Sequence, residues 1–393
     1  MTKMNKQAIF QNASRIGIMG GTFDPIHYGH LTAAECIRYE KNLDLILFIP
    51  TGQPPHKSTQ TASFHRYLMT CLAVSDNKYF EVSRIEVDRP DFSYTIDTIR
   101  ILKEKTSAEL YFIIGMDEML KFHSWKDADQ LKDLCNWVPV TRPGYKPVKH
   151  SPDRFSPPII EIPGLDISGT ALRERIKNNE PIKYLTHPAV EQYITEMGLY
   201  SKESDFYSKI HQAVSSKLSA KRYRHTLGVI ETAVLLATRY GINIRKAYLS
   251  ALLHDYAKEL SEGEMRKLCN KFNIQIDAIQ DKIIYIMHGH LSAELARHEF
   301  GIDDPEILEA ISFHTTGRAG MGSLAQILKI ADNIEPTRPD FPGLDEIKAL
   351  SSVNLNRAIA ASLNRDLEYT RSKGQIIHPW GLEALEYFKE MLD

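Results

Sequence analysis

Gly20-Gly21-Thr22-Phe23-Asp24-Pro25-Ile26-His27-Tyr28-Gly29-His30 follows a short apolar run and leads into an amphipathic one. Glycines let a backbone approach a ligand closely, and the first turn of a helix offers unpaired N–H groups and a positive dipole to phosphate. His27 and His30 flank the expected helix start, where both side chains can face that phosphate. The stretch therefore predicts a phosphate-binding connection between a strand and a helix, although its glycines alone would also suit a plain tight turn.

Outward from this stretch, short apolar runs alternate with amphipathic ones. The expected strands are Arg15–Met19, Leu43–Pro50, Phe80–Val87 and Leu110–Gly115, with Trp137–Val140 and Ile159–Ile162 as further candidates. The expected helices between them are His30–Glu40, Ser63–Ser75 and Tyr94–Lys105. Such alternation predicts an α/β domain with a parallel, Rossmann-like sheet, which binds ligands at the carboxyl ends of its strands.

The pattern changes after Tyr200. The polar segment Ser201–Asp205 has the composition of a linker, and helical periodicity then continues almost everywhere to Asp393. The expected helices are Ile210–Leu218, His225–Tyr240, Ala247–Glu259, Gly289–Phe300, Pro305–Phe313 and Leu324–Ile334. We therefore predict an α/β domain over residues 1–200 and an all-α domain over residues 206–393, which should stay folded when the linker is cut.

Composition excludes several classes of protein. The 393 residues are 43% hydrophobic, and 48 Lys and Arg balance 50 Asp and Glu, so neither wholesale disorder nor a nucleic-acid-binding polycation is expected. Four scattered cysteines suit a reducing compartment and argue against a thiolate zinc site. No stretch approaches the roughly 20 apolar residues of a membrane span, and the N-terminus lacks the apolar core of a secretory signal. We expect a cytoplasmic enzyme without nucleic-acid or membrane partners, and its oligomeric state stays open.

Residues 20–30 resemble the GxFDPxHxGH signature of the nucleotidyltransferase superfamily, whose two histidines contact ATP phosphates. Ile167-Ser168-Gly169-Thr170-Ala171-Leu172-Arg173 resembles the superfamily's ISSTxIR motif, from which Gly169 and Leu172 depart. The plain alternative is that Ser168 and Thr170 only cap a helix.

Further segments resemble the bacterial nicotinate mononucleotide adenylyltransferases. Residues 48–57 resemble their substrate-phosphate loop, residues 93–98 their pyridine-ring segment, and Phe112–Asp117 with Trp125 their ring-stacking region. Residues 140–144 and 187–200 resemble their closing elements. Residues 93–98 and 112–125 disfavour another transferase of the superfamily, such as one for pantetheine phosphate. The resemblance implies ATP- or substrate-binding roles for Gly20, Gly21, Thr22, Phe23, His56, Lys57, Thr95, Asp97, Gly115, Asp117, Trp125, Arg142, Ser168 and Thr170.

The reaction that this resemblance implies is transfer of AMP from ATP to nicotinate mononucleotide, which gives deamido-NAD and pyrophosphate. The attacking phosphate is already anionic near pH 7, so catalysis can rest on positioning and charge neutralisation. His27, His30, Arg173 and Mg²⁺ bound to ATP are suited to that work. A pyridine carboxylate would favour backbone N–H groups near Thr95 and an aromatic platform such as Trp125, but the residues alone leave the choice between acid and amide substrate open.

The helical half carries histidines and aspartates in apolar helical contexts. Charged or polar residues at the end of an apolar run, as at His254-Asp255, usually indicate a metal site or an ion pair. Any single histidine, taken alone, is more simply an ordinary core or surface residue. Their order resembles the HD phosphohydrolase superfamily, which implies one metal on His225, His254, Asp255 and Asp332, and a second with His288 and His314. Nitrogen and oxygen ligands suit two transition-metal ions, with iron the first expectation and Mn, Co, Ni or Zn the alternatives. The family has one histidine at this point, so we take His288 as the ligand and expect His290 at the surface or in a supporting position.

Residues 254–258, 314–318 and 331–338 resemble the bacterial HD-domain symmetrical dinucleoside-tetraphosphate hydrolases. This implies cleavage of diadenosine tetraphosphate into two ADP, with Asp255 bridging two cations that bind phosphate oxygens and lower the pKa of bound water. Lys258 and Arg318 are then candidate anchors for the polyphosphate, or simply solvated side chains. The alternative is a nucleotide-sensing module without turnover, which the presence of all expected ligands disfavours.

Overall fold

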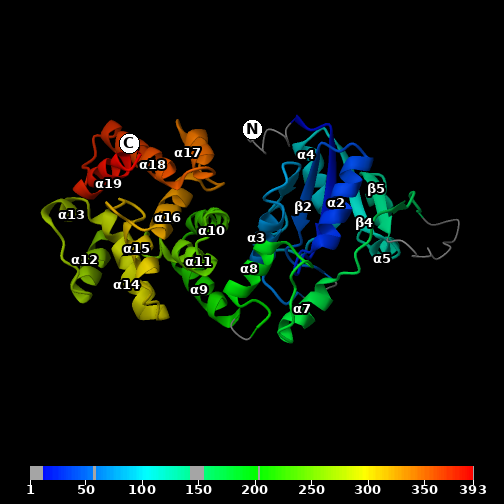
Figure 1. Cartoon of the computed structure of the whole chain (residues 1–393), viewed down its shortest axis with the longest axis horizontal. Coiled ribbons are helices and arrows are strands. Elements are labelled where there is room, and N and C mark those ends of the chain that lie inside the picture. Colours follow the sequence, from blue (N-terminus) through cyan, green and yellow to red (C-terminus); the bar gives the residue numbers. More distant parts are fainter. Residues whose placement is uncertain (1–11, 56–58, 142–154, 202–203, 393) are drawn as a thin grey trace. The chain divides into compact units, whose positions relative to one another are not determined.

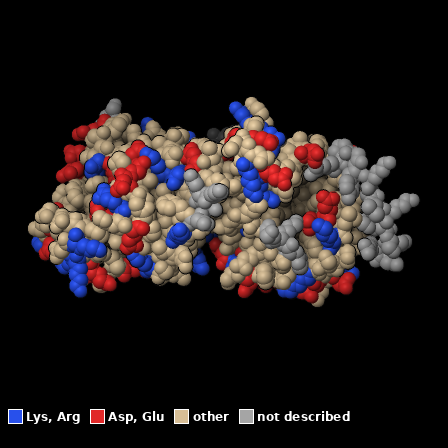
Figure 2. All heavy atoms as spheres, turned by 90° about the horizontal axis from the view of Figure 1, so that it is seen from below, with Lys and Arg blue, Asp and Glu red and all other residues tan. Residues whose placement is uncertain are grey.

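The computed structural model describes residues 12–55, 59–141, 155–201 and 204–392 (Figure 1). Contacts divide the chain into two compact units, residues 1–202 and 203–393. Acidic and basic side chains are interspersed on the face shown in Figure 2, in keeping with the formal net charge of -2. No helix among the described residues is long and apolar enough to cross a membrane.

The first unit is built on a six-stranded parallel sheet of order β3-β2-β1-β4-β5-β6, which confirms the predicted α/β fold. Its strands are β1 (Arg15–Gly21), β2 (Leu45–Pro50), β3 (Phe80–Val82), β4 (Glu109–Gly115), β5 (Asn136–Thr141) and β6 (Ile160–Glu161). Its helices are α2 (Tyr28–Glu40), α3 (Ser63–Ala73), α4 (Thr95–Lys105), α5 (Met116–Met119), the 3₁₀ turn η1 (Phe122–Ser124), α6 (Ala128–Leu131), α7 (Gly169–Lys177) and α8 (Pro188–Met197).

Both faces of this sheet are covered. Ile18 of β1 and Phe112 of β4 pack on one face with Ile96 of α4 in a single buried cluster. Successive side chains of a strand point to opposite faces, so buried neighbours such as Ile46 and Phe48 belong to the other face. Burial on both faces explains why the strands read as nearly continuous apolar runs.

The strand order reverses between β1 and β4. The chain passes outward from β1 to β2 and β3 in one direction, and from β4 to β5 and β6 in the other. The carboxyl ends of the two central strands flank the crevice where sheets of this kind bind ligands. Gly20 and Gly21 end β1 and Gly115 ends β4, so the predicted phosphate-binding stretch begins at this crevice.

The expected strand Phe80–Val87 is shorter than its apolar pattern suggests. It ends at Val82, and after Ser83 donates its N–H to the carbonyl of Phe48 the chain turns away from the sheet. This turn brings the Glu86 carbonyl so close to Gly52 that a Cβ there would lie 2.1 Å from it. Packing of the loop after β2 therefore overrides the strand propensity of residues 83–87.

In the second unit, helices joined by turns and loops are the only regular elements among the described residues, 204–392, as predicted. Its helices are α9 (Ser204–Lys217), α10 (Ala220–Tyr240), α11 (Ile244–Leu253), α12 (Glu262–Lys271), α13 (Ala278–Lys282), the 3₁₀ turn η2 (Ile284–Met287), α14 (His288–Phe300), α15 (Pro305–Phe313), α16 (Ser323–Ile334), α17 (Leu344–Ser351), α18 (Leu355–Ser372) and α19 (Pro379–Glu390). Helices α10, α11, α14, α15 and α16 pack on one another at its centre (Figure 1).

One expected helix of this unit was too long. Periodicity predicted Ala247–Glu259, but α11 ends at Leu253 and residues 254–259 form consecutive turns. Nδ1 of His254 lies 2.7 Å from the carbonyl oxygen of Ala251, and the backbone N–H of Lys258 donates to the carbonyl of Asp255. Leaving the helix at this point directs His254 and Asp255 into the centre of the unit.

Candidate functional site

His27 and His30 lie together where α2 begins. His27 is the residue that caps the helix, and its backbone N–H donates to Nδ1 of His30 over 3.3 Å. The two rings stack with centroids 3.8 Å apart, and Gly29 leaves room for them, since a Cβ there would lie 3.0 Å from Nδ1 of His27. Burial and the neighbouring His27 lower the pKa of His30 well below its usual value. A neutral His30 imidazole, stacked on His27, therefore stands at the positive end of a helix dipole.

Asp24 joins this loop to the second predicted phosphate motif. Its backbone carbonyl accepts a hydrogen bond from Nη1 of Arg173 at 2.6 Å, and its carboxylate accepts one from the Tyr200 hydroxyl at 2.8 Å. Ser168 caps α7 by accepting from the N–H of Ala171, as the plain alternative expected. A Cβ at Gly169 would lie 3.0 Å from the Asp24 carbonyl, which explains the departure from the serine of the motif.

Arg173 also reaches Thr170, whose Oγ1 lies 3.1 Å from its Nη2. The structure thus brings His27, His30, Thr170 and Arg173 together beyond the carboxyl end of β1, where the strand order reverses. Such a set of imidazole, hydroxyl, guanidinium and helix N–H groups is suited to binding a polyphosphate.

The residues predicted to hold the second substrate lie around α4 and α5. Thr95 begins α4, and Asp97 in its first turn is paired with Lys126 at 3.1 Å. Gly115 precedes α5, and Asp117 lies in its first turn. His56, Lys57 and Arg142 are outside the described residues.

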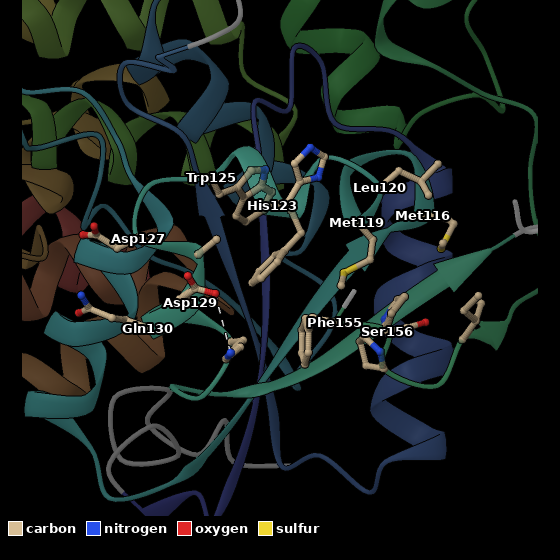
Figure 3. A pocket seen from close by; sticks show the side chains of 16 residues that line it. Met116, Met119, Leu120, His123, Trp125, Asp127, Asp129, Gln130, Phe155 and Ser156 are labelled. Atoms are coloured by element: carbon tan, nitrogen blue, oxygen red, sulfur yellow. Dashed lines mark ion pairs between the residues drawn. The ribbon is translucent and has the colours of Figure 1, made fainter. Parts of the chain in front are cut away.

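Trp125 lies at the edge of an aromatic cluster and borders a cavity of about 540 Å³ (Figure 3). Its ring meets Phe122 at 5.7 Å and Trp137 at 6.0 Å between centroids. Met116, His123 and Phe155 line the same cavity, from the segments that follow β4 and precede β6. Trp125 is therefore an aromatic wall of a cavity, in addition to packing against the core.

In the second unit, six side chains from five helices or the residues just after them gather in one cluster around Asp255. They are His225 of α10, His254 and Asp255 just after α11, His288 of α14, His314 just after α15, and Asp332 of α16. Oδ2 of Asp255 lies 3.8 and 3.4 Å from the Nε2 atoms of His225 and His254. Oδ1 lies 3.2 and 3.6 Å from those of His288 and His314. Each oxygen of Asp255 thus faces its own pair of imidazoles.

Backbone carbonyls fix the orientation of three of these histidines. Nδ1 of His254, His288 and His314 lies 2.7, 2.6 and 2.8 Å from the carbonyl three residues earlier. A carbonyl can only accept, so Nδ1 carries a proton and Nε2 is the atom that faces Asp255, where it donates to the carboxylate in a charged ring and offers its lone pair to a metal in a neutral one. The Nε2 atoms of His288 and His314 are 3.0 Å apart, so their lone pairs would repel each other without a positive charge between them.

The charge states of the cluster also suit a metal. Burial alone would raise the pKa of Asp255, but the surrounding histidines outweigh it and hold that pKa well below its usual value. Burial lowers the pKa of His288, and it lowers the pKa of His314 to about 4. Ionised carboxylates and neutral imidazoles are the forms that bind metal. Two groups of ligand atoms, each within 4.8 Å, could hold an ion: His225 with His254 and Asp332, and His254 with Asp255 and His314.

Glu335 supports His225, a role that the sequence did not indicate. Its Oε1 lies 3.0 Å from Nδ1 of His225, which leaves Nε2 of His225 to face Asp332, also at 3.0 Å. Gly228 makes this approach possible, because a Cβ there would lie 2.2 Å from Oε2 of Glu335. Carboxylate support of a histidine ligand fixes its tautomer and raises its basicity.

Other predicted residues divide between the cluster and its surroundings. Lys258 lies beside the cluster, with Nζ 3.2 Å from Nε2 of His288. Arg318 is engaged elsewhere: it forms an ion pair with Glu309 and lies over the ring of Phe313. His290 packs against Phe313 and Trp380, and burial lowers its pKa to about 4.

Known proteins match the two units separately. A family model described as cytidylyltransferase-like matches residues 18–175. The "Probable nicotinate-nucleotide adenylyltransferase" of Moorella thermoacetica is 48% identical over 203 residues, which cover 49% of this chain and 94% of that protein. The chain belongs to the nicotinate-nucleotide adenylyltransferase family. A relative of the same name from Thermoanaerobacter sp. (strain X514) is 47% identical over 205 residues, covering 49% of this chain and 96% of its own length.

The second unit of this adenylyltransferase family member carries an HD domain, whose family model matches residues 222–337. A Clostridium acetobutylicum protein described as a predicted HD superfamily hydrolase involved in NAD metabolism is 37% identical to it. That match covers 47% of this chain and 97% of that protein, with a TM-score of 0.46.

The first unit, which matches the adenylyltransferases, contains one further residue that holds its loops together, Arg66, and the sequence did not indicate this role. Arg66 of α3 is fully buried. Its guanidinium donates to the carbonyls of Thr22 at 2.6 Å, Gly52 at 2.9 Å and Thr61 at 3.1 Å. These carbonyls belong to the loops that follow β1 and β2 and to the segment before α3. A charged residue in a helical stretch reads as a surface residue, so only the fold reveals this role.

Replacing Arg66 by methionine is expected to lower the free energy of unfolding of the first unit by about 3 kcal/mol or more, because it leaves three buried carbonyls without their donors. Tryptophan fluorescence during urea unfolding measures this, since Trp125 and Trp137 lie in the first unit. Arg100→Met is the matched control, because Arg100 makes an exposed contact with Gln130. A loss below about 1 kcal/mol would mean that water or neighbouring groups satisfy the carbonyls.

Proposed function

We propose that the first unit transfers the adenylyl group of ATP to nicotinate mononucleotide, giving deamido-NAD and pyrophosphate. The observation that carries this proposal is the joining of His27 and His30 to Arg173 through Asp24 at the switch point of the sheet. A phosphate oxygen of the mononucleotide attacks the α-phosphorus, and the bond from that phosphorus to the bridging oxygen of pyrophosphate breaks. Arg173 would offset the leaving charge, and His27, His30 and the N–H groups of α2 would stabilise it by hydrogen bonds. Mg²⁺ would supply further positive charge on the triphosphate.

The acid rather than the amide substrate is part of this proposal. The first turn of α4, at Thr95, offers backbone N–H groups, and its preceding residue Tyr94 makes no side-chain cap. A pyridine carboxylate is the group that such donors favour. Incubating the full-length protein with ATP, Mg²⁺ and either nicotinate or nicotinamide mononucleotide tests the preference. Faster conversion of the amide would contradict the acid assignment, and conversion of neither would contradict the activity.

We also propose that the HD unit hydrolyses diadenosine tetraphosphate to two ADP, and that residues 1–200 and 206–393 are separate catalytic domains. Water adds to one central phosphorus, the bond to the central bridging oxygen breaks, and the proton passes to the ADP that leaves. Each oxygen of Asp255 faces its own pair of imidazoles, and this arrangement supports binding of two cations. The proposed ligands are His225, His254, His288, His314, Asp255 and Asp332. When bound, such cations would polarise phosphate oxygens and the attacking water.

Product analysis tests this second activity. The full-length protein, supplied with Fe²⁺, Mn²⁺, Co²⁺, Ni²⁺ or Zn²⁺ in turn, is incubated with diadenosine tetraphosphate and the nucleotides are separated. ADP as the sole product supports symmetrical cleavage. AMP together with ATP would mean attack at an outer phosphorus, and binding without cleavage under every metal would favour a nucleotide-sensing module.

A further inference from the structure

Three basic side chains surround the His and Asp cluster of the HD unit. Arg222, one turn before His225 on α10, donates from Nη1 to Oδ2 of Asp255 at 3.0 Å. Arg338, in the turn after α16, donates from Nη2 to Oδ1 of Asp332 at 2.6 Å. Nζ of Lys258 lies 3.2 Å from Nε2 of His288. The three cations come from three different segments and meet at one cluster.

Two of these side chains mark where the cluster opens to solvent. The side chains of Arg222 and Arg338 are 31% and 34% exposed, whereas that of Asp255 is 3% exposed and that of His288 is fully buried. The histidines and Asp255 therefore form a buried floor. Solvent reaches the cluster at the two guanidinium groups and, with 18% of its side chain exposed, at Asp332.

The three positive charges also act on one another. Burial lowers the pKa of Lys258, Asp255 and Asp332 raise it, and the charges of Arg222 and Arg338 lower it again. Asp255, Asp332 and Glu335 supply three negative charges near these three positive ones, and Glu259 interacts with Arg222 as well. Any divalent cation bound at the cluster then adds positive charge that these carboxylates do not balance. An anion with several negative charges is the partner that balances it.

We propose that Arg222, Lys258 and Arg338 form a clamp for the phosphate groups next to the one that is cleaved. The HD unit then selects a chain of several phosphates over a single phosphate group. The proposal rests on the hydrolase function proposed above. A guanidinium matches two phosphate oxygens at once, and the Lys258 ammonium acts as a point charge. A lone phosphate could use the cluster but would leave the clamp without a partner.

Calorimetric titration of the full-length protein, loaded with Mn²⁺, tests the clamp with two probes, inorganic tripolyphosphate and orthophosphate. Arg222→Gln and Arg338→Gln are each expected to weaken tripolyphosphate binding about tenfold and orthophosphate binding less than about threefold, with the bound manganese unchanged. Arg266→Gln is the matched control, since Arg266 pairs with Asp281 on the surface of the same unit and should leave both affinities unchanged.

Equal weakening of both anions would overturn the clamp, because the arginines would then act on the phosphate at the cluster itself. Loss of manganese would overturn it too, by making the arginines supports of the ligands. If the glutamine variants do not fold, Arg222→Lys and Arg338→Lys keep the charge but lose the two-pronged donor, and an undiminished tripolyphosphate affinity in both would contradict the proposal. If the variants weaken tripolyphosphate binding selectively but the wild-type protein does not cleave diadenosine tetraphosphate, the hydrolase function is refuted and the clamp still stands.

Discussion

Replacing His30 by alanine is expected to lower the turnover of adenylyl transfer by at least about 100-fold, the usual effect of losing one preorganised contact to a transition state. The ring of His30 stacks on His27 at the first turn of α2, beside the loop that Arg173 holds through the Asp24 carbonyl. The variant retains the helix and the sheet, so binding of nicotinate mononucleotide should change far less than turnover. Steady-state kinetics with ATP and Mg²⁺ separates the two effects.

A histidine outside both sites gives the control for this prediction. His298 is largely exposed, stacks on Phe272 and lies near Glu294 in the second unit, so His298→Ala should leave adenylyl transfer unchanged. Near-normal turnover in the His30 variant would remove His30 from the catalytic assignment. A loss of folded protein, seen as a lower unfolding midpoint, would attribute the effect to stability instead.

The α/β fold could be predicted because its local signals agree with its packing. Buried strands such as β2 read as apolar runs, and the glycine-rich stretch after β1 marks the switch point. The end of β3 at Val82 could not be predicted, because it depends on the contact between Glu86 and Gly52, which are far apart in sequence. Single-sequence patterns carry no information about such a contact.

The sequence also predicts part of the His and Asp cluster of the second unit. Family resemblance favours His288 over His290, and the structure directs Nε2 of His288 toward Asp255 while His290 packs against Trp380. Supporting residues were harder to find, since Arg222 and Glu335 look like ordinary charges on a helix and in a loop. The close approach of Glu335 to Gly228 explains why a glycine lies within α10.

The largest effect in the second unit is expected from Asp255→Ala. This change removes the one side chain whose two oxygens face both imidazole pairs, and it leaves Arg222 and Lys258 beside the cluster without their nearest carboxylate. We expect the purified protein to carry more than one transition-metal ion per chain, and the variant to lose most of this metal, because binding is coupled to the charge and geometry of the ligands. Elemental analysis of the two proteins, prepared side by side, measures the loss.

Hydrolysis of diadenosine tetraphosphate should vanish together with the metal, while adenylyl transfer persists, since the two sets of residues lie in different units and share no member. Asp303→Ala is the matched control: Asp303 is exposed in the same unit, pairs with Arg297, and should affect neither metal content nor either activity. Full retention of metal in the Asp255 variant would refute a bridging role for this carboxylate. A wild-type protein that holds at most one ion would reduce His288 and His314 to contacts for substrate or structure, because the second pair of imidazoles would then have no cation to bind.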